Sequence, residues 1–341
     1  MYCSTVESKE LRERLEALNR SGRHPKIRWI SLKNLIDLNG YAHRASFALV
    51  PNRSLPFPRL LPWFLGNAIP VGLSAFGGGL DLLNWGTSYY IPAVLRFGPE
   101  AALGEPLVAQ AFWSEPEIGS LQKIMRYIFL HPREAQIRGL LLKRKGVEMY
   151  SWAKVMEKIF ERLTAKRAEK VSASGKLAQL FKEQQSIYWL AKGALSLLLR
   201  DWKEAEIQIS KCLDLELTSE IAKGLLARAQ ARSGKMDGLP WITEAVAHEK
   251  LSSFTLANWV SACHGLGEHN LRNKLLAQLE DDTEGTLLTI LTLYEDGQSE
   301  EAVRLCEQVC RDKNDPTAKA ILGILSCDPS HSQDTTRHAT L

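Results

Sequence analysis

The sequence predicts an all-α protein in which an array of helical hairpins follows an irregular N-terminal module rich in glycine and proline. Eight of the fourteen prolines lie between Pro51 and Pro106, and only three follow Pro132. A proline inside a helix removes a backbone hydrogen bond. The residues after Pro132 can therefore be helical over long stretches, and their apolar residues recur at helical spacing.

Composition and charge narrow the class of protein. The chain has 341 residues, of which 45% are hydrophobic and 24% charged, as in an ordinary globular protein of one large or two average domains. These values exclude disordered, collagen-like and polytopic membrane proteins. The formal net charge of +4 is too small to predict a nucleic-acid partner.

The cysteines and the N-terminus indicate the compartment. The six cysteines show no C-x-x-C spacing, which favours reduced thiols over a disulfide framework. The first ten residues lack the basic start and apolar run of a secretory signal. We therefore expect a cytoplasmic protein.

The chain divides by pattern into three parts. We expect an irregular N-terminal module at 1–130, a helical repeat domain at 131–327 and a polar, disordered tail at 328–341. Within the module, residues 7–20 have the spacing of a short charged helix. Residues 27–50 mix short apolar runs, so the pattern does not separate helix from strand there.

Residues 60–95 form an apolar segment whose only formal charge is Asp81. Such charge depletion is typical of membrane-embedded stretches, but glycines and prolines interrupt it, and irregular backbone is not tolerated facing lipid. Two alternatives follow. The segment is an interfacial hairpin with four aromatic side chains at headgroup depth, or it is buried against the helices that follow. The four aromatic residues are Trp63, Trp85, Tyr89 and Tyr90.

The most informative pattern lies between residues 189 and 205. Trp189 is followed four residues later by Gly193, then by a turn at Asp201–Trp202, and Ala205 lies twelve residues after Gly193. This spacing resembles the tetratricopeptide-repeat (TPR) family, whose 34-residue unit is a helix-turn-helix. Small residues in such a hairpin let the two backbones approach.

Further units with the same resemblance extend it over about residues 132–316. Each has a small residue in its first helix or a glycine at its turn. The positions are Gly139 with a turn at Gly146, Ala227 with a turn at Gly234, a turn at Gly267, and a turn at Asp296–Gly297 followed by Ala302. The resemblance implies a helical-hairpin (TPR-like) superhelix, capped by a last helix after Pro316.

The TPR resemblance also implies a concave groove lined by the first helix of each hairpin. A groove floor of mixed polarity favours an apolar helix or an extended peptide as the partner. The predicted groove residues are Leu190, Ala194, Leu197, Arg228, Arg232, Ser261, His264, Leu291 and Tyr294. The alternative is that the leucines near 190–198 belong to a core covered by the N-terminal module.

A basic stripe recurs every four residues after Trp152. It lies opposite apolar residues of the same predicted helix, so that the helix is strongly amphipathic. Its members are Lys154, Lys158, Arg162, Lys166 and Lys170. The stripe suits an acidic partner, RNA phosphates or anionic headgroups, and is equally compatible with a solvated face; nucleic acid is the weakest of these hypotheses.

No catalytic, cofactor-binding or metal-binding constellation is predicted. Cys306 and Cys310 lie one turn apart, but no further ligands follow at the usual spacing. The glycines at 77–79 lack the Gly-Lys-Ser/Thr of a phosphate-binding loop. An enzyme would require Asp81, Ser74 and either His43 or His131 to converge in one pocket.

Three functions remain, in decreasing order of expectation. The first is a non-catalytic scaffold that binds a protein partner, a peptide or helix, in its groove. The second is a membrane-associated scaffold of an envelope or secretion assembly, anchored through residues 60–95. The third is an enzyme, or a protein that binds RNA or an anionic ligand.

Overall fold

The structure is a computed structural model that divides into two compact units, residues 1–45 and 46–341. It describes residues 13, 16–20, 44–53, 58, 60–80, 84–97, 101–102, 105–106, 112–164, 173–215, 220–248 and 251–327. In the first unit, residues 13 and 16–20 are helical, as predicted for 7–20. Residues 27–43 and the predicted disordered tail at 328–341 lie outside the described residues.

The second unit contains a small parallel sheet that the sequence pattern did not predict. Strands β1, β2 and β3 pair in that order, with Leu49 opposite Gly72 and Leu73 opposite Tyr90. Strands of three or four residues that are largely buried show no polar alternation, so periodicity does not reveal them. The elements are β1 (Ala48–Val50), α3 (Leu61–Gly66), β2 (Val71–Ser74) and β3 (Tyr89–Ile91).

Two antiparallel strand pairs and three helices follow the sheet, and from here on the term N-terminal module means residues 46–164, which include the first residues, 131–164, of the predicted repeat domain. Strand β4 pairs with β7, and β5 pairs with β6. The strands are β4 (Ala93–Phe97), β5 (Ala101–Ala102), β6 (Glu105–Pro106) and β7 (Phe112–Pro116). The helices are α4 (Ile118–Leu130), α5 (Pro132–Tyr150) and α6 (Trp152–Thr164).

The predicted turn at Gly146 is wrong, because α5 continues through this residue to Tyr150. A Cβ atom at position 146 would lie 3.2 Å from Cβ of Leu65 in α3. A Cβ atom at Gly139 would lie 2.1 Å from the carbonyl oxygen of Ala68. Both glycines therefore let α3 and the chain that follows it approach α5 closely.

The described residues after α6 are mainly helical, and the prediction of a predominantly all-α protein is confirmed. The helices are α7 (Ala173–Leu198), α8 (Trp202–Leu213), α9 (Glu220–Arg232), α10 (Leu239–His248), α11 (Ser253–Leu266), α12 (His269–Gln278), α13 (Thr283–Glu295), α14 (Ser299–Lys313) and α15 (Pro316–Ser326). The predicted turns at Gly234, Gly267 and Gly297 are confirmed, with φ angles of 75°, 74° and 78° that favour glycine.

Close packing within the first hairpin of this array depends on small residues. A Cβ atom on Gly193 of α7 would lie 2.3 Å from Cγ1 of Ile209 in α8. Ala205 on the facing side of α8 is fully buried. The two helices therefore contact each other along their backbones, as the spacing of these residues predicts.

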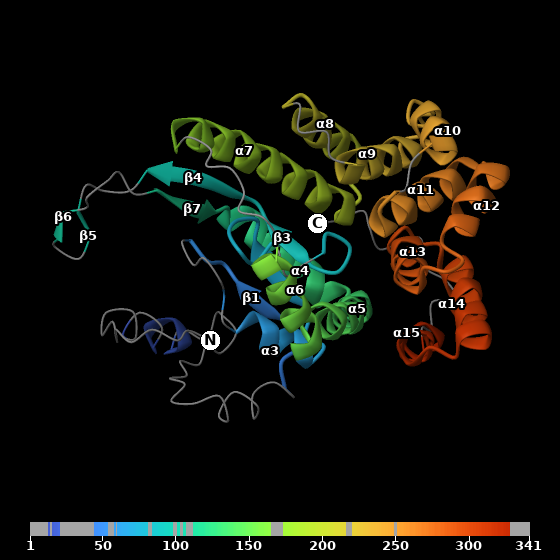
Figure 1. Ribbon diagram of the computed structural model, residues 1–341, viewed down its shortest axis with the longest axis horizontal. Helices are drawn as coiled ribbons and strands as arrows, with labels where there is room; N and C mark the ends of the chain where they lie inside the picture. The colour runs from blue at the N-terminus through green and yellow to red at the C-terminus, as the bar shows by residue number, and fades with distance from the viewer. Residues whose placement is uncertain are drawn as a thin grey trace. The chain divides into compact units, whose positions relative to one another are not determined.

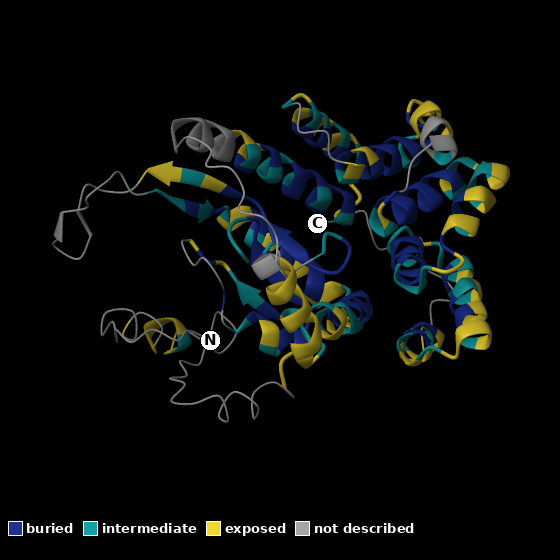
Figure 2. Ribbon diagram, in the orientation of Figure 1, coloured by how far each residue is buried: buried dark blue, intermediate teal, exposed yellow. Residues whose placement is uncertain are grey.

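The helices from α7 to α15 follow one another along an arc (Figure 1). The inner side of this arc is filled by the N-terminal module: α5 packs against α13 and α15, and β3 and β4 pack against α7. A Cβ atom on Gly86 would lie 2.7 Å from Cδ2 of Leu288 in α13. Figure 2 accordingly shows α9 and α11 mostly buried and α6 mostly exposed.

The apolar segment 60–95 is mainly core. Among its described residues, Leu61, Leu73 and Ile91 are fully buried. Tyr89 and Tyr90 are also buried, and Trp63 and Trp85 partly so, which agrees with the buried alternative and not with an interfacial hairpin. No helix among the described residues has both the length and the apolar character needed to cross a membrane.

Replacing Gly193 with alanine should lower the free energy of unfolding by about 1–3 kcal/mol, because the added methyl group would collide with Ile209. Gly323 is the matched control, since it lies inside α15 with no atom within 4 Å of an added Cβ. There the alanine should raise stability by about 0.5–1 kcal/mol through its higher helix propensity. Chemical denaturation measures both values, and equal effects at the two sites would contradict the packing.

Candidate functional site

A buried network of charged side chains lies where the N-terminal module meets the helical array. Arg138 of α5 donates from Nε to Oε1 of Glu134 over 3.0 Å and from Nη2 to Oε1 of Glu295. Its Nη1 donates to the carbonyl oxygens of Gly86, at 3.2 Å, and Ser88, at 3.4 Å. One buried guanidinium thus joins α5, the end of α13 and the segment before β3.

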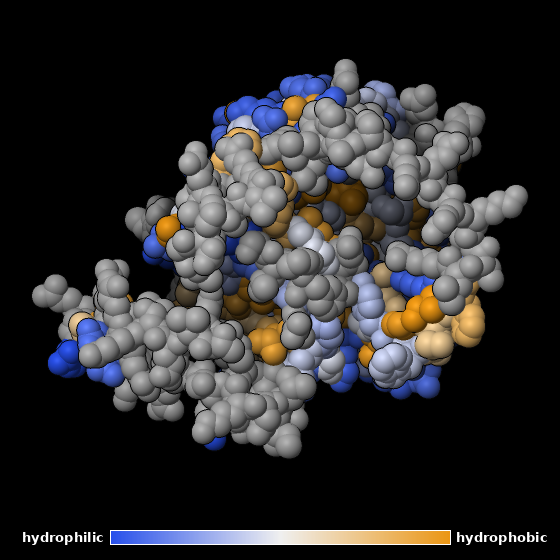
Figure 3. All heavy atoms as spheres, turned by 60° about the vertical axis from the view of Figure 1, so that its left-hand side comes forward, coloured by the Kyte–Doolittle hydropathy of each residue, from blue (hydrophilic) through white to orange (hydrophobic). Residues whose placement is uncertain are grey.

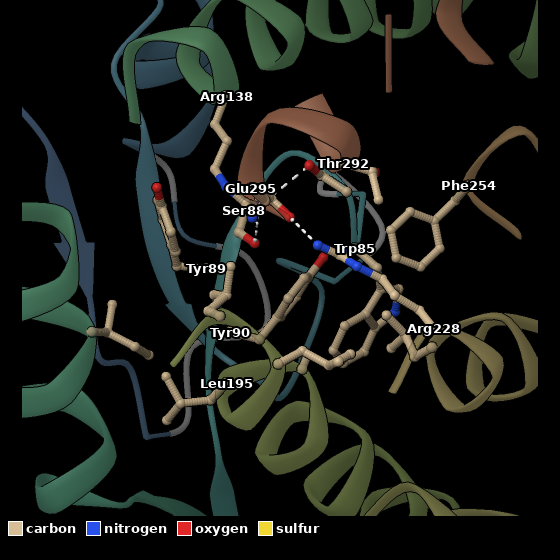
Figure 4. A pocket seen from close by; sticks show the side chains of 16 residues that line it. Trp85, Ser88, Tyr89, Tyr90, Arg138, Leu195, Arg228, Phe254, Thr292 and Glu295 are labelled. Carbon is tan, nitrogen blue, oxygen red and sulfur yellow. Dashed lines mark hydrogen bonds and ion pairs between the residues drawn. The ribbon is translucent and has the colours of Figure 1, made fainter. Parts of the chain in front are cut away.

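Arg228 of α9 continues the network from the other side of Glu295. Its Nη2 donates to Oε2 of Glu295 at 3.1 Å and to Oδ1 of Asp296 at 2.7 Å. Asp296 is also paired with Arg232, 3.0 Å from Nη2 to Oδ2, and accepts a hydrogen bond from the hydroxyl of Ser261. Figure 4 shows Arg138 and Arg228 approaching Glu295 from opposite sides.

Two tyrosines complete the polar contacts on the sheet side. The hydroxyl of Tyr89 donates to Oε1 of Glu134 at 3.3 Å, and that of Tyr127 donates to Oε2. The guanidinium carbon of Arg138 lies 4.6 Å from the centre of the Tyr89 ring. Burial raises the pKa of both tyrosines, and the neighbouring Glu134 raises it further. Both therefore remain donors to Glu134 at neutral pH.

The pKa values of Glu295 and Asp296 are shifted in opposite directions. Burial raises the pKa of Glu295, against the effect of Arg138. Burial also acts to raise the pKa of Asp296, but Arg228 and the hydrogen bonds to it outweigh this, and the pKa of Asp296 lies below its usual value. Burial opposes the charged form of Arg138 and Arg228, yet their acidic neighbours raise both pKa values. The two arginines are thus permanently charged.

A cavity of about 40 Å³ lies beside the network, lined by Trp85, Tyr90, Arg228 and Glu295 among others. This volume has room for a few water molecules, whereas pockets for organic ligands reach about 300–1,000 Å³. The Ser88 and Tyr90 hydroxyls have no hydrogen-bond partner among the described residues. The network pairs the cations Arg138, Arg228 and Arg232 with the anions Glu134, Glu295 and Asp296. We call this set of six side chains the clasp.

Three predicted groove residues are brought together by this network. Arg228, Arg232 and Ser261 all contact Asp296, so these three residues lie on one side of the array. All nine predicted groove residues are buried or partly buried. Those that are buried are Leu190, Leu197, Arg228, Ser261 and Leu291, and those that are partly buried are Ala194, Arg232, His264 and Tyr294.

The leucines of the predicted groove lie in the core. Leu190 and Leu197 are 5% and 3% exposed and share a cluster against which Trp85 packs. This arrangement is the one expected if the N-terminal module covers them, and they do not line an open groove.

His264 accepts a hydrogen bond at Nδ1 from Nη1 of Arg272 over 2.9 Å. Burial and this guanidinium lower the pKa of His264.

The basic stripe is described only in part. Lys154 and Lys158 are exposed on α6; Lys154 pairs with Glu157 at 2.6 Å, and Lys158 lies 5.9 Å from the centre of the Tyr150 ring. Arg162 lies in α6, but its side chain is outside the described part, as are Lys166 and Lys170 altogether. The opposite side of α6 carries exposed apolar residues, namely Trp152, Met156, Ile159 and Phe160.

The residues named for an enzyme do not form a described site. Asp81 and His43 lie outside the described residues. Ser74 is buried at the end of β2, and His131 stacks on Tyr127 with ring centres 4.3 Å apart; neither lines the cavity. Within the described ranges, no three His, Cys, Asp or Glu side chains are arranged to hold a metal ion.

The network was not predicted from the sequence, although the sequence contains a signal for it. Arg228 and Arg232 lie one turn apart on α9, between alanines and leucines that are buried. Charged residues inside an otherwise apolar helix require buried partners. The adjacent Glu295 and Asp296 at the end of another apolar helix supply the matching anions.

Replacing Arg228 with methionine should lower the free energy of unfolding by about 3–5 kcal/mol, because Glu295 and Asp296 would each lose a buried cationic partner. Arg304 pairs with Glu301 on the surface with 67% of its side chain exposed, and methionine there should cost less than about 1 kcal/mol. Urea denaturation compares the two variants. Similar losses at both positions would show that the network contributes no more than a surface ion pair.

The Asp296→Asn substitution should make the free energy of unfolding depend less on pH in the acidic range. Because the folded protein holds the pKa of Asp296 below its usual value, this group stabilises the fold above its ordinary pKa of about 4, and that contribution is lost as the pH falls. Glu295, with a raised pKa, acts with the opposite sign. Denaturation should show that the free energy of unfolding of the variant is lower than that of the wild type at about pH 6 and falls less between there and about pH 2. The exposed Asp312→Asn control should follow the wild type.

Comparisons with known proteins identify no relative of this chain: no family model, no curated protein and no solved structure matches it. The resemblance to TPR proteins therefore stands on the residues quoted from the sequence. A proposal about function must start from the contacts, burial and charges of this chain.

Proposed function

We propose that the protein is a non-catalytic, cytoplasmic interaction scaffold of the TPR-like kind. Helical hairpins with turns at the predicted glycines support this proposal. So does the clasp around Glu295, which holds the array and the N-terminal module in one arrangement. A scaffold of fixed shape binds a partner without a further ordering cost in its own chain.

The observation that carries the proposal is the distribution of exposed apolar side chains. Among the described residues, nine of the sixteen large hydrophobic side chains that are exposed lie between residues 118 and 160. They are Ile118, Met125, Phe129, Leu130, Val147, Trp152, Met156, Ile159 and Phe160. On the face drawn in Figure 3, hydrophobic side chains reach the surface beside hydrophilic ones. We place the partner on α4–α6, outside the filled inner side of the arc.

A membrane-associated scaffold is the second candidate, with a changed point of attachment. Burial of Leu61, Leu73 and Ile91 does not support anchoring through residues 60–95. The amphipathic helix α6 offers an attachment that leaves the core intact, since its apolar face is exposed.

Site-specific photo-crosslinking in cells tests the docking surface. A photoreactive residue at Met125 or Met156 should crosslink to another macromolecule or to lipid, because both side chains are 42% exposed on the proposed surface. Matched probes at Lys274 and Gln278, which are exposed on α12, should give background only. Equal crosslinking at all four positions, or none, would contradict a docking surface on α4–α6.

A further inference from the structure

Helix α6 exposes an apolar face to solvent, where apolar surface is unfavourable. Trp152 is 82% exposed, Phe160 60%, Ile159 43% and Met156 42%. These four residues recur at spacings of three, four and seven, so they lie on one side of the helix. The described part of the chain packs α6 mainly against α5. So much exposed apolar area on thirteen residues marks a binding surface.

The helices around this face are strongly basic. Residues 118–164 contain ten Lys and Arg against four Asp and Glu, an excess greater than the net charge of +4 of the whole chain. Glu134 and Arg138 are both buried in the clasp, and Arg144 and Lys145 are paired with Asp315 and Glu284 outside this region. Exposed cations are found on all three helices, with Lys123 and Arg126 on α4, Lys143 on α5, and Lys154 and Lys158 on α6. A partner for this region should therefore be anionic as well as apolar.

The charged residues of α6, acidic and basic, lie on the side away from its apolar face. Glu161 follows Trp152 by nine residues, which is two and a half turns, and so lies on the opposite side of the helix. Lys154 and Lys158 share this polar side, where Lys154 is paired with Glu157. A helix is only about 10 Å across, so charges of both signs on α6 remain within about one Debye length of a surface beneath the apolar face. The positive excess near this face therefore comes from Lys123 and Arg126 on α4 and Lys143 on α5.

We propose that α6 binds the surface of an anionic lipid bilayer, with its axis parallel to the membrane and Trp152, Met156 and Ile159 inserted below the headgroups. Thirteen residues span about 20 Å, too short to cross a hydrocarbon core of about 30 Å, so the helix lies in the interface. Tryptophan and phenylalanine on one side with lysines on the other is the pattern of interfacial helices. The inference rests on the proposed docking function of α4–α6 and names its partner.

Vesicle sedimentation with the full chain tests the inference. The protein should bind vesicles of phosphatidylcholine with 30% phosphatidylserine far better than vesicles of phosphatidylcholine alone, and about 0.5 M salt should weaken this binding. Ile159→Glu should reduce partitioning at least about tenfold. Ile207→Glu is the matched control, because Ile207 is 51% exposed on α8, and this variant should bind as the wild type does.

Other outcomes separate this inference from the scaffold proposal. Equal loss of binding in the Ile159 and Ile207 variants, or no binding to either vesicle, overturns the lipid inference. Crosslinks from Met156 to a protein, with no vesicle binding, also overturn the lipid inference. They support the proposed docking surface on α4–α6. A second copy of the chain at this face is recognised by light scattering, as a wild-type dimer that Ile159→Glu dissociates, and it too overturns the lipid inference. Circular dichroism confirms that both variants are folded.

Discussion

The arrangement of this protein depends on the burial of Glu295 between Arg138 and Arg228. A carboxylate removed from water is costly unless cations and donors surround it. Here the two guanidinium groups come from α5 and α9, which belong to different parts of the chain. Arg138 is also paired with Glu134 and Arg228 with Asp296, so Glu295 is the carboxylate that joins two already paired arginines. The position of the N-terminal module against the helical array is thereby tied to electrostatics as well as to apolar packing.

This clasp has a consequence for where a partner can bind. The segment at 84–91 enters the inner side of the arc because Arg138 binds its carbonyl groups and Gly86 allows close approach to α13. Trp85 and Tyr90 stack with ring centres 4.0 Å apart next to Leu197 and Leu225. An inner face of hairpins that would hold a foreign peptide thus holds a segment of the same chain. Large apolar side chains are exposed instead on the outer helices α4–α6, and for this reason we propose the docking surface there.

Local features of the fold follow from the sequence, and distant ones do not. Gly234, Gly267 and Gly297 end helices because a positive φ suits glycine, and this depends on neighbouring residues only. The contact between Gly193 and Ile209 follows from spacing within one hairpin. Arg138 and Glu295 are 157 residues apart, and no periodicity reveals such a pair. Gly146 misled the prediction because a glycine serves equally for a turn and for close packing, and only α3 distinguishes the two.

The amphipathic pattern correctly predicted that α6 is a helix, but a local pattern does not show whether the apolar face of a helix is buried or exposed. Periodicity shows that a helix has an apolar side, but the helix is buried or exposed according to what the remaining chain places against it. Leu190 and Leu197 have the pattern of a surface groove and are covered by Trp85. Trp152 and Ile159 have the pattern of a packed helix and are exposed. Helix α9 is held by ion pairs with Glu295 and Asp296 at the end of α13, and α7 is paired with Glu117 through Lys192. Helix α6 instead leaves its apolar side exposed, and α4 and α5 carry exposed cations. The bilayer surface that we propose for α6 matches both features, because its headgroups are anionic and its interior is apolar.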